Sequence, residues 1–139
     1  MKYLILLMCF VSSFAFAQVA NTNYTPLPQA TQTATTVNSP VQTNYNYRGG
    51  HFIINVMTVT GGTYTPHIQA QDPISFTWYD ILVGPTISAS GITILKIYPG
   101  IGVVTNGSAS DILPLTWRVQ LIGASTPNMM ISVDVYLEL

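Results

Sequence analysis

The stretch ISVDVYLEL, residues 131–139, alternates apolar and polar side chains over its whole length. Successive side chains of a β-strand point to opposite faces of the sheet, so a period of two directs one set to a core and the other to solvent. The apolar set is Ile131, Val133, Val135, Leu137 and Leu139. The stretch therefore predicts a half-buried strand in an antiparallel sheet.

The segments before this strand have the same β character and are separated by turn residues. Strands are expected at residues 51–60, 65–71, 76–83, 92–98 and 117–121, where β-branched and aromatic residues gather. Turns are expected at Gly61-Gly62, Asp72-Pro73, Gly84-Pro85 and Pro99-Gly100, and a loop at residues 101–113. No stretch of about ten residues after residue 17 has helical spacing. The pattern predicts an all-β fold, a single antiparallel β-sandwich of the jelly-roll or Ig-like type with about seven or eight strands.

Two segments of the chain are similar to each other. Residues 59–66 read VTGGTYTP and residues 121–127 read LIGASTP. Both run from a predicted strand into a glycine-containing turn and then into Thr-Pro. We interpret the similarity as repeated turn chemistry and not as a duplicated domain.

The N-terminal segment, residues 1–17, has the pattern of a secretory signal peptide. Lys2 supplies the positive charge, residues 3–14 are largely apolar, and Ala15-Phe16-Ala17 is an A-x-A cleavage site that leaves Gln18 as the new N-terminus. The apolar run is shorter than the roughly 20 residues of a membrane-spanning helix. We therefore expect export, with membrane contact only transiently through the signal peptide.

Cys9, the single cysteine of the chain, lies within this signal segment. Cleavage would leave a mature chain that has no disulfide, no thiol nucleophile and no cysteine-bound metal.

Residues 18–46 form a polar segment rich in Thr, Gln, Asn and Pro, and the β domain is expected at residues 47–139. Pro26, Pro28 and Pro40 interrupt regular structure. We expect an extended arm over residues 18–33 and an edge strand between Thr35 and Tyr45. Composition favours a flexible spacer over an arm that docks on a neighbouring subunit.

The charge content limits the classes of partner. Charged residues make up 6% of the chain, against roughly 25% in an average soluble domain. The basic residues Lys2, Arg48, Lys96 and Arg118 form no cluster, so no nucleic-acid partner is expected. The formal net charge of −1 removes one barrier to self-association. It fits a subunit that packs against copies of itself as a homo-oligomer, and it also fits a protein held at a wet, crowded surface.

Catalytic and metal-binding patterns are missing from the sequence. The two histidines, His51 and His67, have no third ligand at suitable spacing, so neither a metal nor another cofactor is expected. Asp72 precedes a proline and reads as a turn residue, and Asp80 is expected on a solvated strand face. No phosphate-binding loop and no nucleophile elbow occurs. The sequence predicts that the protein is not an enzyme.

Aromatic residues are the candidate interaction residues. Trp117 lies in an alternating strand and is expected in the core. Trp78 and Tyr79 are adjacent in a predicted strand, so they point to opposite faces and one of them is expected to face outward. Together with Tyr64, they are the candidates for stacking on a glycan.

The ordered features of residues 48–139 resemble a family of small structural proteins of tailed bacteriophages. They are RGG at 48–50, the strand ending VTGG at 59–62, TPHIQAQDP at 65–73, WYDIL at 78–82, ASG at 89–91, YPGI at 98–101, Asn106, DILP at 111–114 and TWRV at 116–119. The resemblance implies a virion-associated β-sandwich, either a head-decoration or a tail-associated subunit, whose partners are copies of itself or other virion proteins.

Two functional hypotheses follow. The first is a non-enzymatic structural subunit located in the virion. Virion proteins assemble in the cytoplasm and need no export, so the signal segment supports a different destination. The second hypothesis is a secreted or surface-attached recognition module, periplasmic or extracellular, that binds a glycan or a host protein.

Overall fold

Two strands of 23 residues each, β4 (Gly49–Gln71) and β8 (Thr116–Glu138), run antiparallel beside each other and organise the fold. The computed structural model describes residues 21–139. The predicted signal peptide and its cleavage residues Ala15, Ala17 and Gln18 lie outside this range. The long pair extends from Gly49 opposite Glu138 to Ala70 opposite Trp117.

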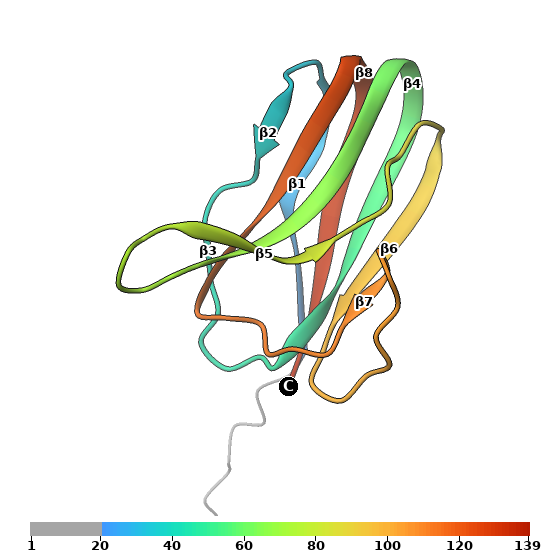
Figure 1. The fold of residues 1–139 in the computed structure, drawn as a ribbon. Helices are drawn as coiled ribbons and strands as arrows, with labels where there is room; N and C mark the ends of the chain where they lie inside the picture. The colour runs from blue at the N-terminus through green and yellow to red at the C-terminus, as the bar shows by residue number, and fades with distance from the viewer. Residues whose placement is uncertain (1–20) are drawn as a thin grey trace, which may run out of the picture.

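The other strands flank this central pair (Figure 1). One half of the sheet contains β1 (Thr22–Gln32) on β8, and β6 (Gly91–Ile97) on β4. The other half contains β2 (Thr36–Asn38) and β3 (Gln42–Thr43) on β8, and β5 (Trp78–Val83) on β4. The short strand β7 (Ser108–Ala109) pairs in parallel with the end of β6.

The prediction of an all-β fold is confirmed, because residues 21–139 contain strands and no helix. Contrary to the prediction from the sequence, the strands are not all antiparallel. All eight described strands belong to one sheet, and the parallel β6–β7 pair makes it mixed. No helix in the described part of the chain is long and apolar enough to cross a membrane.

Both long strands bend at one corner, where the pairing register shifts. Gly61 pairs with Asn128 and Thr63 with Ala124, so three residues of β8 lie opposite Gly62. Ser125 and Thr126 adopt φ values of 55°, and Gly62 a φ of 64°. Extra residues in one strand bend it and increase its twist.

This corner corrects two sequence-based expectations. Gly61-Gly62 was expected to be a turn between separate strands, but β4 continues through it to Gln71. The stretch 117–121 was expected to be separate from the C-terminal strand, but both belong to β8. The two similar segments, 59–66 and 121–127, meet at this corner from opposite strands. The two glycine-containing segments therefore form one bend together and not two separate hairpin turns.

The core lies between the two halves of the bent sheet. Phe52 belongs to the first half of β4 and Trp117 to the opposite end of β8, yet their rings are 5.3 Å apart and perpendicular. Both side chains are completely buried, which confirms the expectation for Trp117. The inner faces of the two halves therefore pack against each other. The same alternation buries Ile54, Val56, Ile68, Val119, Leu121, Ile131, Val133 and Val135.

The polar N-terminal segment joins the sheet, in contrast to the free arm expected over residues 18–33. Residues 22–32 form β1, and Leu27 is buried in the core. Pro26 and Pro28 fit because β1 is an edge strand with register shifts on both sides of Leu27. The edge strand expected between Thr35 and Tyr45 is present as two short strands, β2 and β3.

Candidate functional site

The loop between β4 and β5, residues 72–77, projects away from the rest of the sheet (Figure 1). We call these six residues the tip. The turn expected at Asp72-Pro73 is present here. The three residue pairs next to the tip, from Gln69 opposite Asp80 to Gln71 opposite Trp78, are in register, and the pairing shifts between Ile68 and Gln69.

Hydrogen bonds centred on Asp72 hold the tip in one conformation. The carboxylate accepts from the backbone N–H of Ile74 at 2.9 Å and from the hydroxyl of Ser75 at 2.6 Å. The backbone of Asp72 accepts from Phe76 N–H and donates to the carbonyl of Thr77, both at 2.9 Å. Asn and Asp side chains stabilise turns in this way. The Ser75 hydroxyl, followed by the Ile74 amide, lowers the pKa of Asp72, because both hydrogen bonds favour its charged form.

The ordered tip presents two large apolar side chains to solvent. Ile74 is 87% exposed and Phe76 is 69% exposed. Phe76 also has a φ of 56°, a region that bulky residues rarely occupy. The Gln71 side chain supports this conformation by donating to the carbonyl of Phe76 at 3.0 Å. Strained residues held by their surroundings occur preferentially at functional sites.

Two of the three predicted aromatic candidates directly follow the tip, at the start of β5. Trp78 is half-buried on the outer face, where the Arg118 guanidinium carbon lies 4.2 Å from its ring centroid. Tyr79, which points to the other face, is 51% exposed. Tyr64 is elsewhere. It is completely buried, its hydroxyl donates to the carbonyl of Ala34 at 2.7 Å, and burial raises its pKa. Tyr64 is therefore a core residue and not an accessible aromatic.

A polar network crosses the outer face of this half of the sheet. Asp80 lies between His67, whose Nδ1 is 2.9 Å from Oδ2, and Gln69, whose Nε2 donates to Oδ1 at 2.9 Å. A carboxylate only accepts, so Nδ1 of His67 carries the hydrogen in that contact. The Gln69 amide also contacts Gln120 at 3.2 Å and accepts from Arg118 Nε at 2.8 Å. Burial lowers the pKa of Arg118. These contacts link β8, β4 and β5 through side chains.

The histidines form pairs and no metal centre. His67 pairs with Asp80, and Nε2 of His51 lies 3.6 Å from Glu138. Among residues 21–139, no group of three or more His, Cys, Asp or Glu side chains could hold a metal ion. The His67–Asp80 contact joins β4 to β5 directly below the tip.

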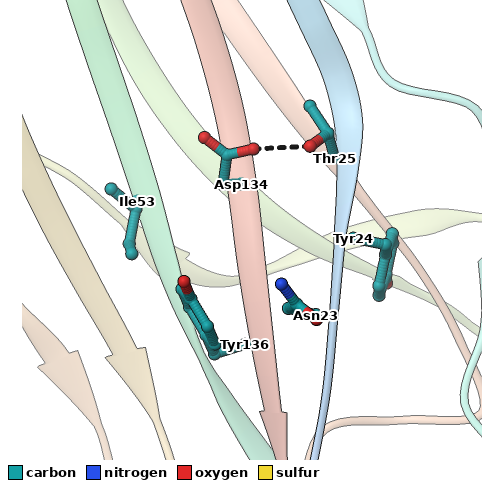
Figure 2. Close-up of a pocket in the computed structure, with 6 residues that line it drawn as sticks. All are labelled: Asn23, Tyr24, Thr25, Ile53, Asp134 and Tyr136. Atoms are coloured by element: carbon teal, nitrogen blue, oxygen red, sulfur yellow. Dashed lines mark hydrogen bonds between the residues drawn. The ribbon is translucent and has the colours of Figure 1, made fainter.

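A shallow pocket lies on the outer face of the other half of the sheet (Figure 2). Its volume is about 140 Å³, and Asp134 faces it while accepting from the Thr25 hydroxyl at 2.5 Å. Tyr136, which is 48% exposed, forms one wall. Small-molecule sites usually have volumes of about 300–1,000 Å³. The small volume and the engaged carboxylate make this pocket a weaker candidate than the tip.

A larger pocket of about 390 Å³ lies beside β6 and β7. We call it the apolar pocket. It is lined by Lys96, Ile101, Gly102, Val104, Gly107 and Ser108. The backbone folds around it because the Ser108 hydroxyl donates to the carbonyl of Gly102 at 2.6 Å and accepts from Val104 N–H at 3.0 Å.

The chain has no match among protein-family models, curated proteins or solved structures.

The sequence did not single out Ile74, and it predicted that Phe76 begins the strand at 76–83, whereas in the structure this strand begins at Trp78. The available signal was the segment DPISFT at residues 72–77, which places two large apolar residues directly after a turn-forming Asp-Pro. An apolar residue inside a turn has no strand neighbour to pack on and is therefore a candidate for exposure.

Proposed function

We propose that the protein is a non-enzymatic structural subunit that docks through the β4–β5 hairpin. The resemblance to tailed-phage structural proteins supports a place on the virion, as a head-decoration or tail-associated subunit. In this proposal the bent sheet acts as a β-sandwich whose two layers share the strands β4 and β8. Its partners are copies of itself or other virion proteins.

One observation carries this proposal: the described surface exposes large apolar side chains while charges are scarce. The chain contains four Lys or Arg and five Asp or Glu residues, and the exposed large hydrophobic side chains outnumber all of them. Charged residues are depleted at the centres of protein interfaces, so a surface that is poor in charge is suited to contact with another protein. The most exposed of these side chains, Ile74, lies on the tip beside Phe76.

The test is mass spectrometry of purified virus-like particles and of the secreted fraction from the source culture. Trypsin should release residues 49–96, 97–118 and 119–139, together with a fragment that ends at Arg48. Detection of these peptides in the particles, with the fragment that ends at Arg48 starting at Tyr3, would support a virion subunit that keeps residues 1–17. Detection of the peptides only in the secreted fraction, with the fragment that ends at Arg48 starting at Gln18, would contradict the virion proposal.

The polar network favours a second candidate function, a secreted recognition module. An aromatic surface lies next to hydrogen-bonding groups here. Trp78, with Arg118 stacked on it, provides the aromatic surface, and the amides of Gln69 and Gln120 provide the hydrogen-bonding groups. Glycan sites combine such groups. Titration with glycans while Trp78 fluorescence is followed would test it. Saturable quenching that disappears in Trp78→Ala would support this candidate, and no change with any glycan would contradict it.

A further inference from the structure

We propose that the tip of one copy of this chain inserts into the apolar pocket of a second copy. The inference rests on the proposed function, because it names the partner of the same docking hairpin. Phe76 is the anchor, Ile74 packs beside it, and Ile101 and Val104 of the other copy form the receiving walls.

The two surfaces lie on opposite sides of one molecule. In Figure 1 the tip projects on the left of the molecule, whereas β6 and β7, which contribute Lys96 and Ser108 to the pocket, lie on the right. A contact between two different patches leaves one free tip and one free pocket after each addition. Such head-to-tail contacts produce a closed ring or an open filament. A symmetric dimer would bury the same patch on both partners and leave neither surface free.

The pocket suits the tip in size and in apolar character. Its volume of about 390 Å³ is within the range of sites that hold small molecules, so it can receive a phenyl ring. Two of its lining residues are glycines and two are large aliphatic residues, so the ring meets few polar groups. The conformation of Phe76 is already set by hydrogen bonds, so little freedom is lost on docking.

Charge provides a second match between tip and pocket. Lys96 lines the pocket and Asp72 anchors the tip. Within residues 21–139, neither Lys96 nor Asp72 takes part in an ion pair. Docking would bring this cation and this anion together, and an ammonium group near a phenyl ring adds a cation–π attraction. Because the chain carries both the cation of the pocket and the anion of the tip, a second copy of the chain is the favoured occupant of the apolar pocket.

The experiment uses two variants of the full chain, each of which destroys one side of the contact. Phe76→Asn removes the anchor, and asparagine tolerates a positive φ, so the fold should be retained. Val104→Trp fills the pocket. Sedimentation velocity should show wild-type assemblies larger than a dimer, and monomers for each variant alone. Loss of an anchor residue should weaken association by about tenfold or more.

Mixing the two variants provides the decisive result. The Val104→Trp chain keeps its tip and the Phe76→Asn chain keeps its pocket, so a 1:1 mixture has one productive contact. Native mass spectrometry should show a heterodimer and nothing larger.

The controls are two substitutions at exposed residues outside both surfaces. Val103→Trp places the same bulk beside the pocket without lining it, and Tyr136→Ala removes an exposed aromatic from another face. Both should assemble as wild type does.

Each other outcome overturns the inference. A wild-type chain that stays monomeric, variants that assemble normally, or a mixture that stays monomeric would exclude this contact. If Phe76→Asn removes the protein from particles but Val104→Trp does not, the tip docks on a different partner. The inference then fails while the proposed function stands. Absence of the wild-type chain from particles would instead contradict the proposed function.

Discussion

Trp117 shows how one residue connects the two halves of the sheet. It is fully buried, it contacts Phe52 edge to face, and its ring lies 6.0 Å from that of Tyr24 in β1. Its indole N–H has no hydrogen-bond partner in the described structure. A buried, unpaired donor costs about 1–3 kcal/mol. The site therefore combines favourable packing with a polar penalty.

Replacing Trp117 by phenylalanine should be tolerated better than its size suggests. The change removes the unpaired donor and keeps an aromatic ring, so we expect a loss of about 1–2 kcal/mol in unfolding free energy. Trp117→Ala should lose about 3–5 kcal/mol. Urea denaturation followed by circular dichroism measures both values. Equal losses for the two variants would mean that the indole N–H has a partner.

Asp72 makes the order of the tip depend on pH. The Ser75 hydroxyl, followed by the Ile74 amide, lowers the pKa of Asp72 in the folded protein. At pH values above the ordinary carboxyl pKa, the hydrogen bonds to its carboxylate therefore stabilise the folded conformation of the tip. That stabilisation is lost as pH falls through the lowered value. Amide NMR signals of Ile74 and Ser75 should shift together below about pH 4. Asp72→Asn, which cannot titrate, should abolish the shared shift.

At the scale of elements, the corner between the halves determines how β4 and β8 fold over the core. Gly62 has a φ of 64°, and a Cβ there would lie 2.6 Å from Pro127 Cα and from the Ala124 carbonyl oxygen. Backbone atoms cannot move aside as a flexible side chain can. The corner therefore requires glycine for conformation and for space.

A matched pair of glycine substitutions separates these two requirements. Gly100 also has a positive φ, of 82°, but an added Cβ there meets no atom within 4 Å. Gly100→Ala should lose only the conformational cost of about 1–2 kcal/mol. Gly62→Ala should lose roughly 3 kcal/mol or more, because a clash is added. Thermal unfolding of both variants gives the comparison, and equal losses would contradict the close packing at the corner.

Alternation predicted the strands well because each strand has one buried face. The runs predicted at residues 131–139 and 92–98 form strands up to Glu138 and Ile97, and Trp117 is in the core. Alternation could not show that β4 passes through Gly61-Gly62, since a bulged corner and a hairpin turn use the same residues. It also missed β1, because Pro26 and Pro28 argue against a strand unless the strand is known to lie at an edge.

The candidate site was predicted less well, for a different reason. Trp78 and Tyr79 were singled out and directly follow the tip, whereas Tyr64 is buried by contacts that its own segment does not reveal. The exposure of Ile74 and Phe76 depends on how far the hairpin extends beyond the sheet. The sequence pattern of residues 72–77 does not show how far the hairpin extends beyond the sheet.

At the level of the whole molecule, the surface has few charges and many exposed apolar side chains, and the proposed function makes the chain a subunit of an assembly. Association of folded chains stabilises them by mass action. The apparent melting temperature of the wild type should therefore rise by about 2–8 °C as protein concentration is raised. Phe76→Asn should melt at a temperature that does not depend on concentration. A constant melting temperature for the wild type would mean that the chain does not self-associate.

The most direct measurement of the docking claim places a photo-crosslinker at the tip. Phe76 is replaced by p-benzoylphenylalanine in the full chain, and isotope-labelled and unlabelled copies are mixed so that crosslinks between copies can be identified. Docking of the tip in the apolar pocket should give crosslinks from position 76 of one copy to residues 101–108 of another. Crosslinks only within one copy, or only to other regions of a second copy, would contradict it.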